Sequence, residues 1–165
     1  MSRRARISRP SLFSNNRFLA NGMSFAREVR TLSIEMTGAN ESECARLELV
    51  SGDQVYRIIR LRSHGSRAFM IEEASLPAAL FPNLTELALR SHRLDEIAQA
   101  YRLPLGQAEE RISVRGASPL AAEALDLASG TKVLSLERVV RARDGRPAEW
   151  RRSECELNSV NFIAG

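Results

Sequence analysis

The sequence predicts an α+β fold, an antiparallel sheet with helices packed against one of its faces. Two long β-hairpins, about eighty positions apart along the chain, carry most of this prediction. Capped helical segments lie before and between them. Strands joined mainly by hairpins form antiparallel sheets, and a domain that adds separate helices to such a sheet belongs to the α+β class.

The two hairpins span 55–77 and 132–156. In each, a run rich in β-branched or aromatic residues leads into a short turn that contains glycine, and a second run follows. The turns are Ser63-His64-Gly65-Ser66 and Arg143-Asp144-Gly145-Arg146. This combination is a strong local signal for a hairpin.

The first strand of the first hairpin places charge where a core-facing strand is normally apolar. Successive side chains of a strand point to opposite faces. One face therefore carries Tyr56, Ile58, Arg60 and Arg62, and the other carries Val55, Arg57, Ile59 and Leu61. Two arginines that follow two large apolar residues on one face indicate a pocket with an anion-binding end.

The residues before this hairpin predict a strand and a short helix. The strand covers 25–36, with Leu32, Ile34 and Met36 on one face. The helix covers 40–49. Asn40 can cap its N-terminus and Glu43 stands three residues later, which is the spacing of a capping box.

Between the hairpins the sequence predicts a short helical turn, two helices and a strand. The turn lies between Pro77 and Pro82. Ser91 is the predicted N-cap of a helix that runs to Tyr101 with an apolar stripe. A strand covers 109–115. The second helix lies between Ser118-Pro119, which opens it, and Ser129-Gly130, which closes it.

Length and composition limit the class of protein. A chain of 165 residues makes one domain with an appendage, or two small domains. Cys44 and Cys155 are too few for a disulfide framework. No apolar run reaches the ~20 residues of a membrane-spanning helix, and the N-terminus lacks the apolar core of a signal peptide. We therefore expect a cytoplasmic protein without a membrane partner.

The composition of residues 1–22 predicts a basic linker or arm. Four arginines (Arg3, Arg4, Arg6 and Arg9) precede a polar stretch that contains Asn and Gly. Such a segment can contact nucleic-acid phosphates, but a solvated tether is the better interpretation. The number of arginines is weak evidence, because all basic residues except Lys132 are arginine, as in proteins from GC-rich genomes.

Common catalytic and metal-binding motifs do not occur in the sequence. His64 and His92 have no His or Cys at metal-ligand spacing. The chain also lacks a glycine-rich phosphate loop, a dinucleotide fingerprint and a nucleophile elbow. We expect no metal and no cofactor.

The carboxylates of the hairpins have two interpretations. Glu73 alternates in phase with Phe69 and Ile71, and a face that combines apolar bulk with a carboxylate is typical of a ligand pocket. Alternatively, Glu72, Glu73 and Glu149 form cross-strand salt bridges with arginines on a solvated face.

An ordered set of short motifs runs through both hairpins and the segment between them. In the first half it comprises Arg60-Leu61-Arg62, Gly65, Glu73 before Leu76-Pro77, and Leu80-Phe81-Pro82-Asn83-Leu84. In the second half it comprises Ser91, Tyr101, residues 109–112, Gly130, residues 133–138 and Asp144-Gly145-Arg146-Pro147-Ala148-Glu149. Over about 18–162 the chain resembles the UTRA domain, the effector-sensing module of HutC/FarR-type GntR transcription regulators.

The resemblance implies a fold similar to that of chorismate lyase, a curved antiparallel sheet with flanking helices. It implies that 23–165 form a UTRA effector-binding domain that binds a small metabolite and forms a homodimer. In the family, a winged helix-turn-helix precedes this domain and binds operator DNA. Residues 1–22 are too few for one, so contact with operator DNA is expected only through a domain that this chain does not include.

The resemblance assigns ligand binding to five side chains: Arg60, Arg62, Glu73, Ser91 and Glu149. Arg60 and Arg62 match arginines that family members aim at a phosphate or carboxylate, which implies an anionic metabolite. Arg93 and Leu94 stand where members that bind sugar phosphates often carry a tyrosine, so effectors of other acidic classes stay open.

Three functional hypotheses follow. The leading one is the sensor domain of a ligand-responsive transcription regulator, and a related one is a lone domain that acts as a dimerising partner of full-length regulators. The alternative is an enzyme similar to chorismate lyase, which cleaves chorismate to a benzoate and pyruvate without a metal. Because the motifs follow the regulator pattern, we expect a sensor and not an enzyme.

Overall fold

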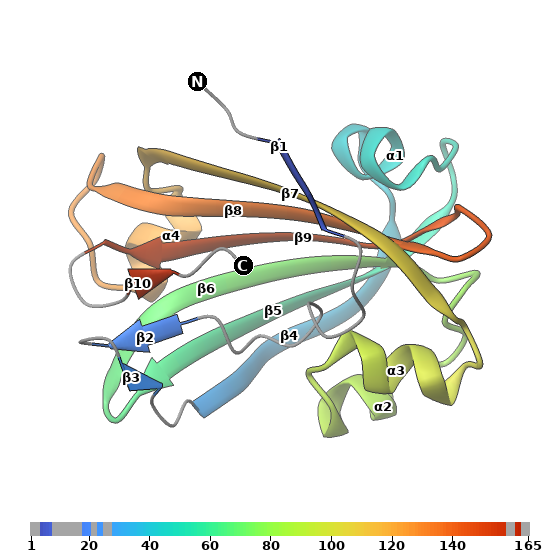
Figure 1. Cartoon of the computed structure of the whole chain (residues 1–165), viewed down its shortest axis with the longest axis horizontal. Coiled ribbons are helices and arrows are strands. Elements are labelled where there is room, and N and C mark those ends of the chain that lie inside the picture. Colours follow the sequence, from blue (N-terminus) through green and yellow to red (C-terminus); the bar gives the residue numbers. More distant parts are fainter. Residues whose placement is uncertain (1–3, 8–17, 21–22, 25–27, 158–160, 163–165) are drawn as a thin grey trace.

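The computed structural model describes residues 4–7, 18–20, 23–24, 28–157 and 161–162. Its centre is a curved antiparallel sheet of seven strands in the order β1-β7-β8-β9-β6-β5-β4 (Figure 1). These strands are β1 (Arg4–Ile7), β4 (Glu28–Gly38), β5 (Gln54–His64), β6 (Arg67–Pro77), β7 (Leu105–Gly116), β8 (Lys132–Ala142) and β9 (Pro147–Glu156). The short strands β2 (Phe18–Ala20), β3 (Met23–Ser24) and β10 (Asn161–Phe162) pair in a second, smaller sheet.

Helices cover both faces of the large sheet. They are α1 (Glu41–Leu47), α2 (Thr85–Arg90), α3 (Leu94–Ala100) and α4 (Pro119–Ala124). Apolar side chains of α2 and α3 pack on the face of β5 that carries Tyr56 and Ile58. On the opposite face α1 packs near Val55, and α4 packs near Leu61. The α+β class with a curved antiparallel sheet is confirmed, but the prediction of helices on one face is wrong, because β5 is apolar on both sides.

Both hairpins form where the sequence predicts them. β5 pairs with β6, and β8 pairs with β9. The turn residues Gly65 and Gly145 have φ of 57° and 91°, in the left-handed region that favours glycine. The long connection between the hairpins leads to the other half of the sheet, where β7 lies between β1 and β8.

The structure differs from the prediction around Ser91. The Ser91 N–H donates to the Leu87 carbonyl (2.9 Å), so this residue ends α2, a helix that the sequence did not indicate. Arg93 is the N-cap of α3. The prediction that Ser91 caps the helix is therefore wrong. Its hydroxyl accepts from the Arg93 N–H (3.2 Å) and donates to Glu96 Oε2 (2.5 Å).

β4 is the edge strand beside β5. A bulge between Thr31 and Ser33 interrupts its pairing with β5, so Leu32 does not continue the predicted alternation. Leu32 and Met36 are 43% and 54% exposed. Residues 25–27 of the predicted strand lie outside the described residues.

Part of the predicted linker lies against the sheet. Residues 4–7 pair with β7, with Arg4 opposite Arg111 and Ile7 opposite Ala108. The assignment of 1–22 as a linker and 23–165 as a domain stays a prediction.

Carboxylates attach both helices of the opposite face to the sheet. The capping box of α1 forms as predicted: Asn40 Oδ1 accepts from the Glu43 N–H (2.9 Å), and Glu43 Oε2 accepts from the Asn40 N–H (2.8 Å). The same carboxylate also accepts from Arg57 of β5 (2.8 and 3.0 Å) and from Ser75 of β6 (2.7 Å). At α4, the Ser118 N–H donates to Glu154 of β9 (3.0 Å). The two helices are thereby fixed at their N-termini.

The environment of Glu43 favours its ionised form. Burial alone would raise the pKa of this carboxyl, but hydrogen bonds from Arg57, Asn40 and Ser75 outweigh burial and lower the pKa below 4.5. A carboxyl whose pKa is lower in the folded state stabilises the fold above its unfolded pKa. This stabilisation is lost as the pH falls through the folded pKa.

We predict that Glu43→Gln lowers the free energy of unfolding by about 1–3 kcal/mol at pH 7. Because protonation of Glu43 removes the same charge, the difference from the wild type should shrink as the pH falls below 4.5. Denaturant unfolding at a series of pH values measures it. Glu41→Gln, at an exposed residue of the same helix, is the control. A difference that does not change with pH would contradict the prediction.

Candidate functional site

Five buried charged side chains meet on the face of the sheet that α2 and α3 cover. They come from three adjacent strands, β5, β6 and β9, where the alternation of side chains points them to one side. Arg60 lies opposite Glu72 in the β5–β6 pairing, and Glu72 lies opposite Ser153 of β9. Each of the five residues is at most 5% exposed. We call Arg60, Arg62, Glu72, Glu149 and Arg151 the arginine cluster.

Ion pairs join four members of the cluster in a row of alternating charge. Arg62 Nε lies 2.9 Å from Glu72 Oε2, and Arg151 Nη2 lies 2.8 Å from Glu149 Oε2. Arg151 Nη1 is 3.6 Å from Glu72 Oε1 and connects the two pairs. Burial acts to raise the pKa of Glu72, but the charges of Arg62 and Arg151 outweigh it and lower the pKa. Glu72 is therefore ionised at neutral pH.

Arg60 is the exception in the cluster. It forms no ion pair with a carboxylate of the described residues, and its side chain is only 2% exposed. Its Nη2 makes long contacts with the carbonyls of Ala88 (3.5 Å) and Ser91 (3.4 Å). Its Nε is buried without a hydrogen-bond acceptor in the described part of the chain.

The surroundings of Arg60 disfavour its charge without removing it. Burial, followed by the nearby positive charge of Arg151, lowers the pKa of Arg60 to about 10. The guanidinium is still protonated at neutral pH. A buried charge is costly unless it is paired, so Arg60 is the point in this cluster where a negative group would be most stabilising.

Arg138, His92 and Cys155 add no net charge to the cluster. Arg138 of β8, which lies opposite Arg151, pairs with Glu110 of β7 (2.5 Å). His92 lies between α2 and α3 and is largely exposed; partial loss of solvation, followed by the charges of Arg62 and Arg60, lowers its pKa. Burial raises the pKa of Cys155 to about 12, so this thiol is protonated at neutral pH.

The structure brings together three of the five residues that the sequence assigns to the site. Arg60, Arg62 and Glu149 belong to the cluster. Ser91 contributes its carbonyl, while its hydroxyl bonds to Glu96.

Glu73 points to the opposite face, where it pairs with Arg152. The sequence placed Phe69 on the same face as Glu73, but Phe69 is the bulged residue of β6. Arg62 lies opposite Met70 and Ser63 lies opposite Ala68, so Phe69 has no opposite residue in β5. Phe69 therefore packs beside Met70 and Cys155 and does not mark the face of Glu73.

Sequence reasoning missed Glu72 and Arg151 as members of the site. Both carried a usable signal. The short turn sets the hairpin register that places Glu72 opposite Arg60, and Arg151 follows Glu149 by two residues on the same face of β9.

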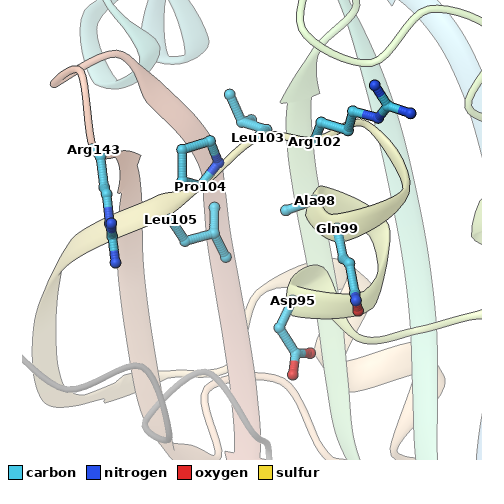
Figure 2. A pocket seen from close by; sticks show the side chains of 8 residues that line it. All are labelled: Asp95, Ala98, Gln99, Arg102, Leu103, Pro104, Leu105 and Arg143. Atoms are coloured by element: carbon cyan, nitrogen blue, oxygen red, sulfur yellow. The ribbon is translucent and has the colours of Figure 1, made fainter.

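Two surface hollows lie outside the cluster. One, of about 570 Å³, lies between α3 and the start of β7, with Arg102 and Arg143 on its rim and Leu103, Pro104 and Leu105 along it (Figure 2). The other, of about 560 Å³, lies beside Met36, Tyr56 and Pro77. Neither is lined by a member of the arginine cluster.

The described residues contain no group of three or more His, Cys, Asp and Glu side chains placed to hold a metal ion. None of the helices in the described part of the chain is long and apolar enough to cross a membrane.

Comparison with known proteins identifies the family. The UTRA domain model matches residues 23–160. This chain belongs to the UTRA domain family. It is the type of domain that binds the effector in GntR-family transcription regulators, so the family indicated by the sequence motifs is confirmed.

Known relatives of this UTRA domain include regulators and their ligand-binding domains. The mannosyl-D-glycerate transport/metabolism system repressor MngR of Escherichia coli (strain K12) is 26% identical over 133 residues. The match covers 79% of this chain and 55% of the relative, so the chain spans about half the length of that protein.

Solved structures share the fold. The ligand-binding domain of a Bordetella bronchiseptica protein assigned as a GntR-family regulator has a TM-score of 0.80 at 24% identity, covering 90% of this chain and 95% of that one. A GntR-family regulator from Enterococcus faecalis V583 has a TM-score of 0.77 at 23% identity, covering 84% and 99%.

We predict that the neighbouring residues Glu72 and Glu73 respond very differently to substitution. Glu72→Gln should cost roughly 3–5 kcal/mol of unfolding free energy, because it removes the negative charge between two buried guanidinium groups. Glu73→Gln should cost about 0–1 kcal/mol, because its pair with Arg152 lies nearer to solvent. Equilibrium denaturation of the two variants measures both values, and equal effects would contradict the assignment of the two faces.

Proposed function

We propose that this UTRA domain binds a small anionic metabolite at the arginine cluster, and that this binding controls a DNA-binding domain outside the chain. The observation that carries the proposal is Arg60, a buried cation whose Nε has no acceptor among the described residues. An anionic group beside Arg60 would replace the solvation that burial removes and would accept charge-assisted hydrogen bonds from Nε and Nη.

The other members of the cluster would hold Arg60 and the ligand in position. The ion pairs of Arg62 with Glu72, and of Arg151 with Glu149, fix these side chains. Ser91 would act through its carbonyl, which is close to Arg60 Nη2. Glu73 is not part of the proposed site, because it lies on the opposite face.

We infer that the domain acts as a sensor and not as an enzyme. A general acid must hold a proton near the working pH, whereas the lowered pKa of Glu72 keeps this carboxyl ionised. The regulators among its relatives support the same inference. Incubation with chorismate should release no pyruvate.

The name of the MngR relative suggests a class of metabolite. It refers to mannosyl-D-glycerate, whose glycerate part is a carboxylate. Sugar acids therefore belong in a ligand screen, together with phosphorylated and phosphonate metabolites.

We predict that a thermal-shift screen of anionic metabolites will find a ligand whose binding depends on Arg60. A ligand that binds only the folded state adds about 2.7 kcal/mol of stability at a hundredfold excess over Kd. Arg60→Ala should weaken its binding by about 1.5–3 kcal/mol and keep the fold. Arg62→Ala should also lower the stability of the free protein, because it leaves Glu72 with the more distant Arg151. Arg67→Ala, at an exposed arginine of β6, is the control.

One result for Arg60→Ala would contradict its proposed role in ligand binding. A lower melting temperature with unchanged ligand affinity would show that Arg60 serves the fold and not the ligand.

We also predict that the domain is a homodimer in solution without preference for an operator sequence. The family supports dimerisation, and operator binding is proposed for a domain outside the chain. Light scattering after size-exclusion chromatography measures the mass, and DNA binding at physiological salt measures the preference. A monomer, or preference for one operator over scrambled DNA, would contradict the prediction. Weak, salt-sensitive retention by the arginines before Pro10 would not.

A further inference from the structure

We infer that the arginine cluster selects a ligand group with a single negative charge, a carboxylate, over a phosphate dianion. This inference rests on the proposed function and narrows its ligand class. It follows from the charge balance of the cluster, from the position of the unpaired charge, and from the atoms that face Arg60.

The charge balance comes first. The cluster contains three arginines and two glutamates, so its net charge is +1. The adjacent pair Arg138–Glu110 adds no net charge. A ligand with one negative charge would therefore bring the buried group to neutrality, whereas a dianion would leave an excess negative charge away from water, which is costly.

The excess positive charge lies at Arg60. Glu72 pairs with Arg62 and Arg151, and Glu149 pairs with Arg151, so in the described part of the chain both carboxylates form their ion pairs with arginines other than Arg60. A carboxylate has two oxygens in one plane, which match two N–H groups of one guanidinium. One such group would satisfy the buried Nε of Arg60.

Backbone carbonyl oxygens near Arg60 would repel additional negative oxygens of a ligand. The carbonyls of Ala88 and Ser91 lie 3.5 and 3.4 Å from its Nη2. These carbonyl oxygens carry partial negative charge, so a ligand group with more negative oxygens would meet more repulsion beside Arg60. Uptake of a proton by Glu72 could offset the second charge, but the flanking arginines resist it, because they lower the pKa of this carboxyl.

Three probes of similar size test the inference at pH 7.5 and constant ionic strength. Glycerol is neutral, D-glycerate carries one negative charge, and glycerol 3-phosphate is mostly a dianion because its second pKa is about 6. Isothermal titration calorimetry and thermal shifts measure binding. We expect saturable binding of D-glycerate, about tenfold weaker binding of glycerol 3-phosphate, and none of glycerol. Arg60→Ala should weaken the binding of D-glycerate by roughly tenfold or more, and Arg67→Ala should keep it.

A charge change in the cluster tests the mechanism of selection. Glu149→Gln raises the net charge to +2, so the preference should move towards glycerol 3-phosphate. Circular dichroism checks that the variant folds. Glu72→Gln is a second variant, which makes the same change in charge at the other carboxylate of the cluster. If neither variant folds, the order of the affinities of the wild type for the three probes decides whether the inference holds.

The outcomes separate this inference from the proposed function. Arg60-dependent binding of glycerol 3-phosphate, as tight as that of D-glycerate or tighter, would overturn the charge rule and leave an anion-binding sensor. Binding of D-glycerate that Arg60→Ala does not weaken would overturn the site. No saturable binding of either anion in the millimolar range would overturn the inference, and failure of the wider metabolite screen would then also remove the proposed function.

Discussion

Pairing of buried charges is the constraint on which the rest of this structure depends. Three strands bring arginines and glutamates under α2 and α3, where each unpaired charge would destabilise the fold. Strands β5, β6 and β9 must therefore keep one register. A slip of one residue would put Glu73 in the place of Glu72 and turn every side chain of the strand to the other face. The same pairs that fix the register leave Arg60 without a carboxylate partner among the described residues, so the fold and the candidate site depend on the same contacts.

The helices illustrate how the sheet stabilises elements that would not persist alone. They have six or seven residues each, and helices this short are marginal in water. Two are held at their N-termini by carboxylates, through Glu43 at α1 and through Glu154 at α4. α2 and α3 are held by apolar contacts instead. Phe81 packs edge to face on Tyr101 at 5.3 Å, and the Tyr101 hydroxyl donates to the Pro82 carbonyl (2.8 Å).

The sequence was informative where local rules decide. The hairpins, the capping box of α1, the Ser118 cap of α4 and the face shared by Arg60 and Arg62 all follow from turn residues, caps and alternation. The alternation rule failed at the bulges near Leu32 and Phe69, because an extra residue shifts the phase and no single-residue signal marks it. The sequence did not predict that helices also cover the second face of the sheet, because the apolar residues of a short helix do not show on which face that helix packs. Ser91 was misplaced because its N–H bonds to the Leu87 carbonyl and it ends α2, a backbone role that a serine in the sequence does not reveal. Arg60 differs from the other arginines of the cluster because it forms no ion pair within the part of the chain that the structure describes. This depends on how three strands pair, which local sequence rules do not predict.

Because side chains alternate between the two faces of β9, the domain contains an intrinsic fluorescence probe. Arg151 lies in the buried cluster, and its neighbour Trp150, the single tryptophan of the chain, points to the other face. There the indole N–H donates to Glu137 (2.9 Å), which also pairs with Arg46 of α1 (2.9 Å), and Arg152 stacks 4.6 Å from the ring centre. A small rotation of β9 that follows a change at Arg151 would alter the hydrogen bond and the charges around the indole. The emission of this tryptophan would then report a change at Arg151 from the face opposite the proposed site, without any attached dye.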